Sequence, residues 1–313
     1  MVTFSLRRLL AFIPVLLGIS LMMFLLNVMA PGDPVKATTG MPRIDPEVAA
    51  RLRAELGLDD PLYVQYGRYL GRLLRGDLGR SYQQRRPVLA VIAERLEPTA
   101  RLAVAAMLLA LLGGLLAGLL AAVRQATWLD HLVMVGALLG ISTPVFWLGM
   151  MLILLFGAQL GWLPISGYGG GRLSHLLLPA VTLGALQMGY IARMTRAAVL
   201  EVIRQDFVRM ARAKGLAERV VIGRHVLKNA LVPVVTVTGL SLANLLAGAP
   251  LTETVFAWPG IGRALVTAVF MRDLPVVMGI TLFFALVYAG LNLLVDLSYA
   301  FLDPRIRQAG QKE

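Results

Sequence analysis

Six stretches of the sequence contain no Asp, Glu, Lys or Arg over 20 or more residues, and together they make up about half of the chain. They are residues 9–32, 102–123, 131–171, 173–192, 229–252 and 274–295. An α-helix needs about 20 such residues to cross ~30 Å of hydrocarbon, whereas a helix on a soluble protein carries charge along one face. The pattern excludes a soluble globular protein, a disordered chain and an outer-membrane barrel, whose strands alternate over ~10 residues. It predicts an all-α polytopic membrane protein with six transmembrane helices.

The remaining charges are unevenly distributed. The 30 Lys and Arg residues exceed the 18 Asp and Glu residues by 12, an excess that would suggest nucleic-acid binding in a soluble protein. Half of this excess lies in residues 193–228, which contain nine basic and three acidic residues. Basic residues near helix ends mark the cytoplasmic side, and Arg7 and Arg8 precede the first helix. We therefore expect both termini in the cytoplasm and no nucleic-acid partner.

The apolar stretches divide the chain into three parts. Residues 1–30 form a transmembrane helix that is too long for a signal peptide. Residues 31–98 are predicted to form a small helical extracytoplasmic domain. Its first helix begins at Asp45-Pro46-Glu47, an N-cap followed by proline, and its second covers about 63–74, lying on the membrane surface or packing on the domain. Residues 99–313 form a five-helix core that includes the 193–228 loop.

Two features of the core are expected to shape its helices. Gly113, Gly114 and Gly118 are small residues that allow close helix approach within a bilayer. The sequence from Gly140 to Pro144 predicts a kink in the third crossing.

The cytoplasmic loop 193–228 contains two basic helical stretches that meet at Gly215, a natural helix breaker. The helical pattern of the fourth crossing runs on to about residue 213. Apolar residues, among them Phe207 and Met210, interleave with the charges. Two interpretations are open: a solvated loop whose charge only sets topology, or a helix–glycine–helix unit that docks into a groove of a partner.

Several motifs in this chain together resemble the permease subunits of the dipeptide/oligopeptide ABC-importer family. The loop motif is Arg212-Ala-Lys-Gly-Leu216, similar to the "EAA" loop of importer permeases. The others are Met29-Ala-Pro-Gly-Asp33, Glu55-Leu-Gly-Leu-Asp59, Gly76-Asp-Leu-Gly79, Thr143-Pro-Val-Phe-Trp147, Arg193-Met-Thr-Arg196, Glu253-Thr-Val-Phe-Ala-Trp-Pro-Gly260, Asp273-Leu-Pro and Leu302-Asp-Pro-Arg305.

The resemblance implies a type I importer permease fold in the cytoplasmic (inner) membrane of a bacterium or archaeon. It also implies partners: a second homologous permease, two cytoplasmic ABC ATPase subunits, an extracytoplasmic substrate-binding protein and the surrounding lipid. Within the family the default cargo is a dipeptide or oligopeptide. Nickel chelates, glutathione and haem are alternatives that the sequence leaves open.

The resemblance assigns the loop the role of a coupling helix, which sits in a cleft of the ATPase and transmits its nucleotide-driven closure. The residues carried over are Arg209, Ala211, Arg212, Lys214, Gly215, Leu216 and Arg219. Two positions depart from the general pattern, since Arg209 replaces its Glu and Leu227-Lys228 replaces its Leu-Pro. Both fit the peptide-type subfamily, and they leave open which residue contacts the ATPase.

Five polar or aromatic residues are candidates for the translocation pathway or its gate. Glu253 and Trp258 follow the fifth crossing, where they form an interfacial loop with the indole at headgroup depth, a gate, or a surface beneath the binding protein. Ser142, Gln187 and Asn244 lie within helices, where each either hydrogen-bonds a neighbouring helix or lines the pathway.

The sequence lacks the residues that several kinds of catalytic, metal-binding and nucleotide-binding site require. The chain has no Cys, and none of its four lysines follows a glycine, so it contains no P-loop. We therefore expect no catalytic residue, metal site or cofactor in this chain, and we expect ATP and Mg to be bound by the partner ATPases. An ATP-independent secondary transporter would predict inverted repeats or mid-membrane carboxylates, which the sequence does not show.

Overall fold

The computed structural model describes residues 2–29, 45–247 and 250–302, without the side chains of some helical residues. These residues form helices and turns, and their only strand-like pairing is an isolated bridge between Arg80 and Pro87. The helices of 15 residues or more are α1 (Val2–Met29), α5 (Val88–Val123), α6 (Trp128–Ser142), α8 (Leu173–Val202), α11 (Leu227–Ala247) and α14 (Leu274–Leu302). The shorter ones are α3 (Pro46–Leu56), α4 (Leu62–Leu74), α7 (Val145–Leu152), α9 (Asp206–Ala213), α10 (Glu218–Val220), α12 (Pro250–Val255) and α13 (Ile261–Phe270). π-helical turns follow α7 and α10, at Ile153–Gln159 and Val221–Val226, and a 3-10 turn covers Gly169–Gly171.

Four helices in the described part of the chain are long and apolar enough to cross a membrane: Leu10–Met29, Val88–Val123, Leu173–Val202 and Leu274–Leu294. The bent pair formed by α6 and α7 makes a fifth span if it is counted as one. The remaining predicted crossing coincides with α11, which has 21 residues and so has the length of a spanning helix. The count of six stays a prediction, because several α11 side chains lie outside the described residues.

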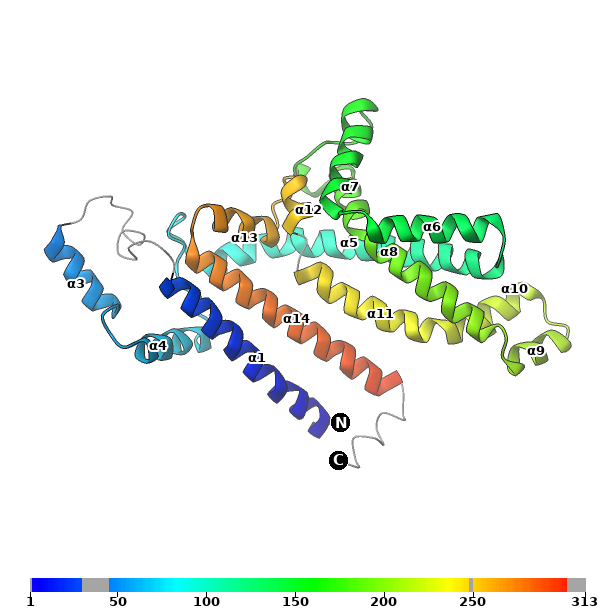
Figure 1. Ribbon diagram of the computed structural model, residues 1–313, viewed down its shortest axis with the longest axis horizontal. Helices are drawn as coiled ribbons and strands as arrows, with labels where there is room; N and C mark the ends of the chain where they lie inside the picture. The colour runs from blue at the N-terminus through cyan, green and yellow to red at the C-terminus, as the bar shows by residue number, and fades with distance from the viewer. Residues whose placement is uncertain (1, 30–44, 248–249, 303–313) are drawn as a thin grey trace.

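The third predicted crossing bends at the expected place. α6 ends at Ser142 and α7 begins at Val145, with an angle of 108° between the two segments. Pro144 provides no N–H for continuing α6, and it disfavours helical dihedrals in the residue before it. Thr143 accordingly adopts an extended conformation with φ −79° and ψ 127°. The predicted kink is therefore confirmed, and it is a sharp turn that gives α7 a different direction (Figure 1).

The centre of the molecule is a close pair of helices, α5 and α8. An ideal Cβ at Gly114 would lie 2.8 Å from Cβ of Ile191 and 2.9 Å from the carbonyl oxygen of Met188. Gly184 of α8 is equally close to α5, since an ideal Cβ at this position would lie 2.7 Å from the Ala106 carbonyl oxygen. Only glycine permits backbones to approach this closely. The prediction for the α5 glycines is confirmed, and around this contact lies the largest buried cluster, which includes α11 residues.

The segment before α5 contains the two helices expected there. Asp45 caps α3 by accepting a hydrogen bond from the Glu47 N–H at 2.9 Å, and α3 ends at Gly57 with φ 65°. α4 packs against the membrane helices, because its Tyr69 forms a buried cluster with Phe24 of α1 and Leu282 of α14. Whether residues 31–98 form a separate domain stays a prediction, since residues 30–44 lie outside the described part.

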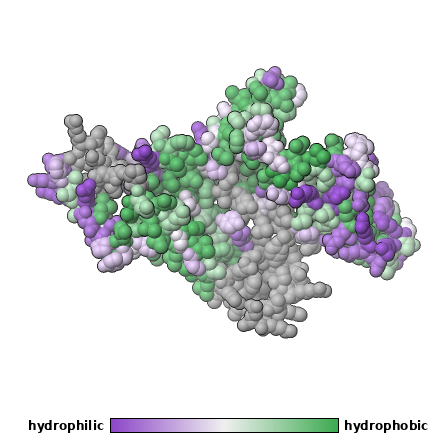
Figure 2. Space-filling view, in the orientation of Figure 1, coloured by the Kyte–Doolittle hydropathy of each residue, from purple (hydrophilic) through white to green (hydrophobic). Residues whose placement is uncertain are grey.

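Hydrophobic side chains cover the outside of the central helices, as expected for contact with lipid. Figure 2 shows hydrophobic residues over α1, α13 and α14 and around α6 and α7, and hydrophilic residues gathered at two ends, one bearing α3 and the other α9 and α10. The outer side of α5 illustrates the pattern with a row of exposed leucines at Leu108, Leu112, Leu116 and Leu120. The fold is thus a bundle of spanning helices with polar structure at opposite ends.

Candidate functional site

The first candidate region is the tip, defined as residues 203–220. α8 ends at Val202, and a three-residue turn separates it from α9, so the predicted continuous helical pattern to residue 213 is wrong at this point. The break lets α9 change direction, which a continued α8 would not allow. α9 then ends where expected, because Gly215 adopts φ +73°, a left-handed conformation that favours glycine.

The tip presents both charge and apolar surface to the outside. The side chains of Arg209 and Asp206 form an exposed ion pair at 3.4 Å. Arg212 donates to Glu218 at 2.6 Å across Gly215, and this hydrogen bond lowers the pKa of Glu218. Met210 is 58% exposed, although methionine is usually buried.

Six of the seven predicted coupling residues are exposed on this tip: Arg209, Arg212, Lys214, Gly215, Leu216 and Arg219. Ala211 is not, because it is only 6% exposed and packs with Val199, Val208 and Val226 beneath α9. Its small side chain therefore supports the tip from inside, and the coupling role of these seven residues stays a prediction. Phe207, 38% exposed, and Met210 are surface residues that the predicted set omitted. Their position between charged residues of the same short helix was the sequence signal that could have added them to the predicted set.

The second candidate region is the hairpin, defined as residues 250–270 and consisting of α12, α13 and the turn between them. Glu253 is fully buried, with 0% exposure. Its carboxylate accepts hydrogen bonds from the Thr99 hydroxyl at 2.7 Å and from the Arg263 N–H at 2.9 Å. Burial raises the pKa of Glu253, and the hydrogen bonds from Arg263, Thr99 and the Gly262 N–H partly offset that rise.

The glycines of the motif make room for this carboxylate. A Cβ on Gly260 would collide with the Glu253 carboxylate, and one on Gly262 would lie 2.7 Å from Cα of Pro250. The Arg263 guanidinium does not neutralise Glu253, because it donates to the Ala257 carbonyl at 2.7 Å. The acid at 253 therefore serves as a buried acceptor of backbone and hydroxyl hydrogen bonds.

Trp258 attaches the hairpin to α5. Its side chain is 1% exposed, and the indole N–H donates to the Pro98 carbonyl at 2.9 Å. The Ile261 N–H donates to Thr99 Oγ at 2.8 Å, so neighbouring residues of α5 hold both sides of the turn. Tyr168 packs edge-on against the indole at 4.8 Å between ring centroids. The indole therefore lies inside the protein, and the choice between an interfacial loop and a gate or docking surface stays a prediction.

The other three pathway candidates are not part of this cluster of described residues. Ser142 is exposed at the end of α6, next to the sharp bend. Gln187 lies within α8 and is 8% exposed. Asn244 belongs to α11, but its side chain lies outside the described residues. A role for these residues in the pathway stays a prediction.

A second buried carboxylate, that of Asp273, connects the segment after the hairpin to the turn before α5. Asp273 is 3% exposed and accepts from the Ser81 hydroxyl and from the backbone N–H groups of Tyr82, at 3.0 Å, and Gln83, at 3.4 Å. A cavity of about 320 Å³ lies beside it, lined by polar and cationic residues that include Arg95 and Arg263. The sequence motif contained Asp273 but did not reveal its partners, which are about 190 positions away. In the described part of the chain, no three His, Asp or Glu side chains are grouped so as to hold a metal ion.

These features define a multi-pass helical membrane protein with a projecting amphipathic tip and a tightly held hairpin. Residues 114–308 match the family described as "Binding-protein-dependent transport system inner membrane component", and residues 1–103 match the N-terminal component of the same systems. The chain belongs to this family and is a permease subunit of a bacterial ABC importer, not an enzyme. Membership places it in the inner membrane and implies a partner ATPase and a substrate-binding protein.

Similar curated proteins extend over nearly the whole chain. The dipeptide transport system permease protein DppB of Alkalihalophilus pseudofirmus is 41% identical, covering 98% of this chain and 100% of that protein. The glutathione transport system permease protein GsiC of Salmonella paratyphi A is 45% identical, with 98% and 99% covered. The di/tripeptide transport system permease protein DppB of Pseudomonas aeruginosa is 44% identical, with the same coverage as GsiC.

Among solved structures, an inward-facing MetNI methionine ABC transporter has a similar chain. The TM-score is 0.52 at 19% identity, with 67% of this chain and 96% of that chain covered. At this identity the likeness concerns the fold, which is that of a type I ABC-importer permease.

Proposed function

We propose that this permease imports dipeptides and short oligopeptides. In the proposed complex it forms half of the translocation pathway, and a second, homologous permease forms the other half. Two ATPases bind ATP and Mg on the cytoplasmic side, and the binding protein delivers the peptide from outside. The proposal draws its cargo from relatives named for dipeptides, for di/tripeptides and for glutathione, which is itself a peptide.

The observation that carries the coupling role is the exposed surface of the tip. Phe207 and Met210 lie in α9 together with exposed Arg209 and Arg212. An amphipathic helix of this kind fits a partner's groove, where the apolar side chains become buried and the arginines meet acidic residues. We therefore assign the tip to ATPase docking, which places residues 193–228 and both termini in the cytoplasm. The positive-inside distribution of charge supports the same orientation.

In this orientation the hairpin lies on the extracytoplasmic side. Its hydrogen bonds to Pro98 and Thr99 attach it to the beginning of α5. We assign it to the surface beneath the binding protein, where a firmly held element gives the docked protein a defined position above the pathway.

The test of docking compares two variants in which exposed apolar side chains are replaced by serine, one in the tip and one elsewhere. The tagged chain is purified from its own host as wild type, as a Phe207→Ser/Met210→Ser variant and as a Leu74→Ser control. Leu74 is 89% exposed in α4, at the other end of the molecule. We expect P-loop ATPases, identified by mass spectrometry, to copurify with wild type and control and to fall at least tenfold with the tip variant. Equal recovery from all three would contradict docking at the tip.

The cargo is tested in proteoliposomes containing the purified complex and its binding protein. Uptake of a labelled dipeptide is measured alone and in competition with a tripeptide, glutathione, a nickel chelate or haem. We expect peptides and glutathione to compete. Competition by haem or the nickel chelate alone would overturn the peptide assignment.

A further inference from the structure

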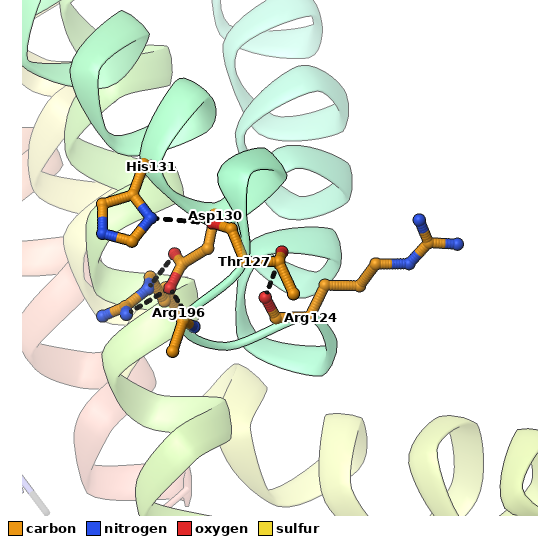
Figure 3. A network of polar contacts seen from close by, with 6 residues as sticks. Arg124, Thr127, Asp130, His131 and Arg196 are labelled. Atoms are coloured by element: carbon orange, nitrogen blue, oxygen red, sulfur yellow. Dashed lines mark hydrogen bonds and ion pairs between the residues drawn. The ribbon is translucent and has the colours of Figure 1, made fainter.

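An ion pair with a buried carboxylate and a partly exposed arginine connects two helices that are far apart in the sequence. Asp130, in the first turn of α6, has a side chain only 4% exposed, and Arg196 of α8 is 27% exposed. The guanidinium donates from Nε to one carboxylate oxygen at 2.6 Å and from Nη2 to the other at 2.7 Å (Figure 3). Paired contacts of this kind fix direction as well as distance, which a single contact does not.

The turn before α6 is built around the same carboxylate. The Ala126 N–H donates to Asp130 at 3.0 Å, from a residue whose φ is +62°. The Thr127 hydroxyl donates to the Arg124 carbonyl at 2.6 Å, and the His131 ring contacts the Thr127 carbonyl at 2.7 Å (Figure 3). The Asp130 carboxylate is therefore held in place by its own turn, and it also accepts the two hydrogen bonds from Arg196 of α8.

The position of Arg196 relates this pair to the tip. α8 continues for only six residues after Arg196 and then turns into α9. Val199 and Val202 of this last part pack with Val208 and Ala211 of α9 in one buried cluster. A force applied to α9 therefore acts on the segment of α8 that Asp130 holds.

Beyond Asp130, the contacts lead toward the hairpin. α6 continues through the sharp bend into α7, where Gly149 packs closely against its neighbours. A Cβ on Gly149 would lie 3.1 Å from the Phe256 ring and 3.2 Å from the Thr182 methyl group. Packed chains of this kind are able to carry coupling between distant sites.

We propose that Asp130 and Arg196 are positioning residues for coupling: they fasten α6 to the last turns of α8, so that movement of the tip is passed to α6, α7 and the hairpin. The proposal rests on the docking role assigned to the tip. An ion pair of this kind contributes little net stability, whereas removal of the arginine leaves the buried Asp130 carboxylate without its partner and the geometry undefined. The pair thus sets the relative position of the two helices.

The experiment measures ATP hydrolysed per molecule of dipeptide transported, in proteoliposomes containing the complete complex. The variants are Asp130→Asn, Arg196→Gln and the conservative Arg196→Lys, which keeps the charge but loses the paired geometry. Arg193→Gln is the matched control, because Arg193 is exposed on the same helix and lies over the face of Tyr190, at 5.9 Å from the ring centroid. We expect the ATP cost per dipeptide to rise about tenfold for Asn and Gln, within the usual 5–150-fold range of coupling. We expect a smaller rise for Lys and none for the control.

Other outcomes are decisive. An unchanged ATP cost combined with a lower unfolding temperature would mean that the pair is only structural, which overturns the proposal. If Asp130→Asn and Arg196→Gln fail to assemble with the ATPases, Arg196→Lys decides: an assembled Lys variant with the wild-type ATP cost contradicts the proposal. If the wild-type complex itself shows no substrate-stimulated hydrolysis, the proposed import function has failed, and not the role of this pair.

Discussion

The hairpin and the tip are both made of short helices joined by a turn at a glycine, but polar side chains are buried in the hairpin and exposed in the tip. In the hairpin, Glu253 and Trp258 are buried and hydrogen-bonded to α5. In the tip, Arg212 and Glu218 pair at the surface, while Met210 stays exposed. The buried polar groups of the hairpin therefore find hydrogen-bond partners within this chain, whereas the exposed side chains of the tip are available to another protein. Substitutions in the hairpin should change stability, and those in the tip should change association.

The largest expected effect is that of Glu253→Leu. Leucine cannot accept from the Thr99 hydroxyl or from the Arg263 N–H, and each buried group left unpaired costs about 1–3 kcal/mol. We expect the free energy of unfolding to fall by roughly 3 kcal/mol, measured by denaturant titration of the purified chain in detergent. Unchanged stability would show that the hairpin is not held by this carboxylate.

Glu253→Gln is the matched control and also tests pH dependence. Its carbonyl can accept from Arg263, and the Thr99 hydroxyl can rotate to accept from its amide, so we expect a loss of about 1 kcal/mol or less. Because the pKa of Glu253 is raised above its ordinary 4.5, the unfolded chain loses this proton first as pH rises. The contribution of Glu253 is therefore full below 4.5 and declines as pH rises through the raised pKa. The wild-type unfolding temperature should decline over this range more than that of Glu253→Gln, and parallel curves would contradict the assignment.

Gly215→Ala should have an intermediate effect, confined to association. The space around Gly215 is open, so a new methyl group meets no other atom, but its φ of +73° costs a residue with a Cβ about 1–2 kcal/mol. We expect ATPase recovery to fall roughly fivefold, since the end of α9 must change shape. Gly223→Ala is the control, because Gly223 also has open space but no positive φ. Equal recovery from both variants would exclude a role for the left-handed turn.

The smallest effect is expected for Glu218→Gln, which removes the ion pair with Arg212. Exposed pairs contribute about 0–1 kcal/mol, so the unfolding free energy should change by less than that. Hydrogen bonding to Arg212 lowers the pKa of Glu218, so its small contribution is present at neutral pH and disappears as pH falls below the ordinary value of 4.5. A loss well above 1 kcal/mol at pH 7 would show that the tip is braced from within like the hairpin. Denaturant titration at pH 7 and pH 4 measures the loss of unfolding free energy and its dependence on pH.

Much of the fold was predictable because its signals are local. Lengths of charge-free sequence indicate spanning helices, Asp45 and Pro46 mark the start of α3, and Gly215 marks the end of α9. The exposure of most of the tip residues has the same local origin, since an amphipathic helix reveals its exposed face in its own spacing, while their coupling role stays a prediction. The break at residues 203–205 was missed because a helical pattern does not reveal where a chain changes direction between two helices.

What the sequence alone determined is therefore the class of molecule and the position of its elements, because a membrane helix has to satisfy its backbone within one continuous apolar segment. Only the tertiary structure decided which polar residues are buried. Glu253 finds Thr99 154 positions away, and Asp130 finds Arg196 66 positions away. Partners at such separations leave no periodic pattern in the sequence, since only the packing of α5, α6 and α8 brings them together. Packing also buries Trp258 against α5 and Ala211 beneath α9, which no local pattern in the sequence had indicated.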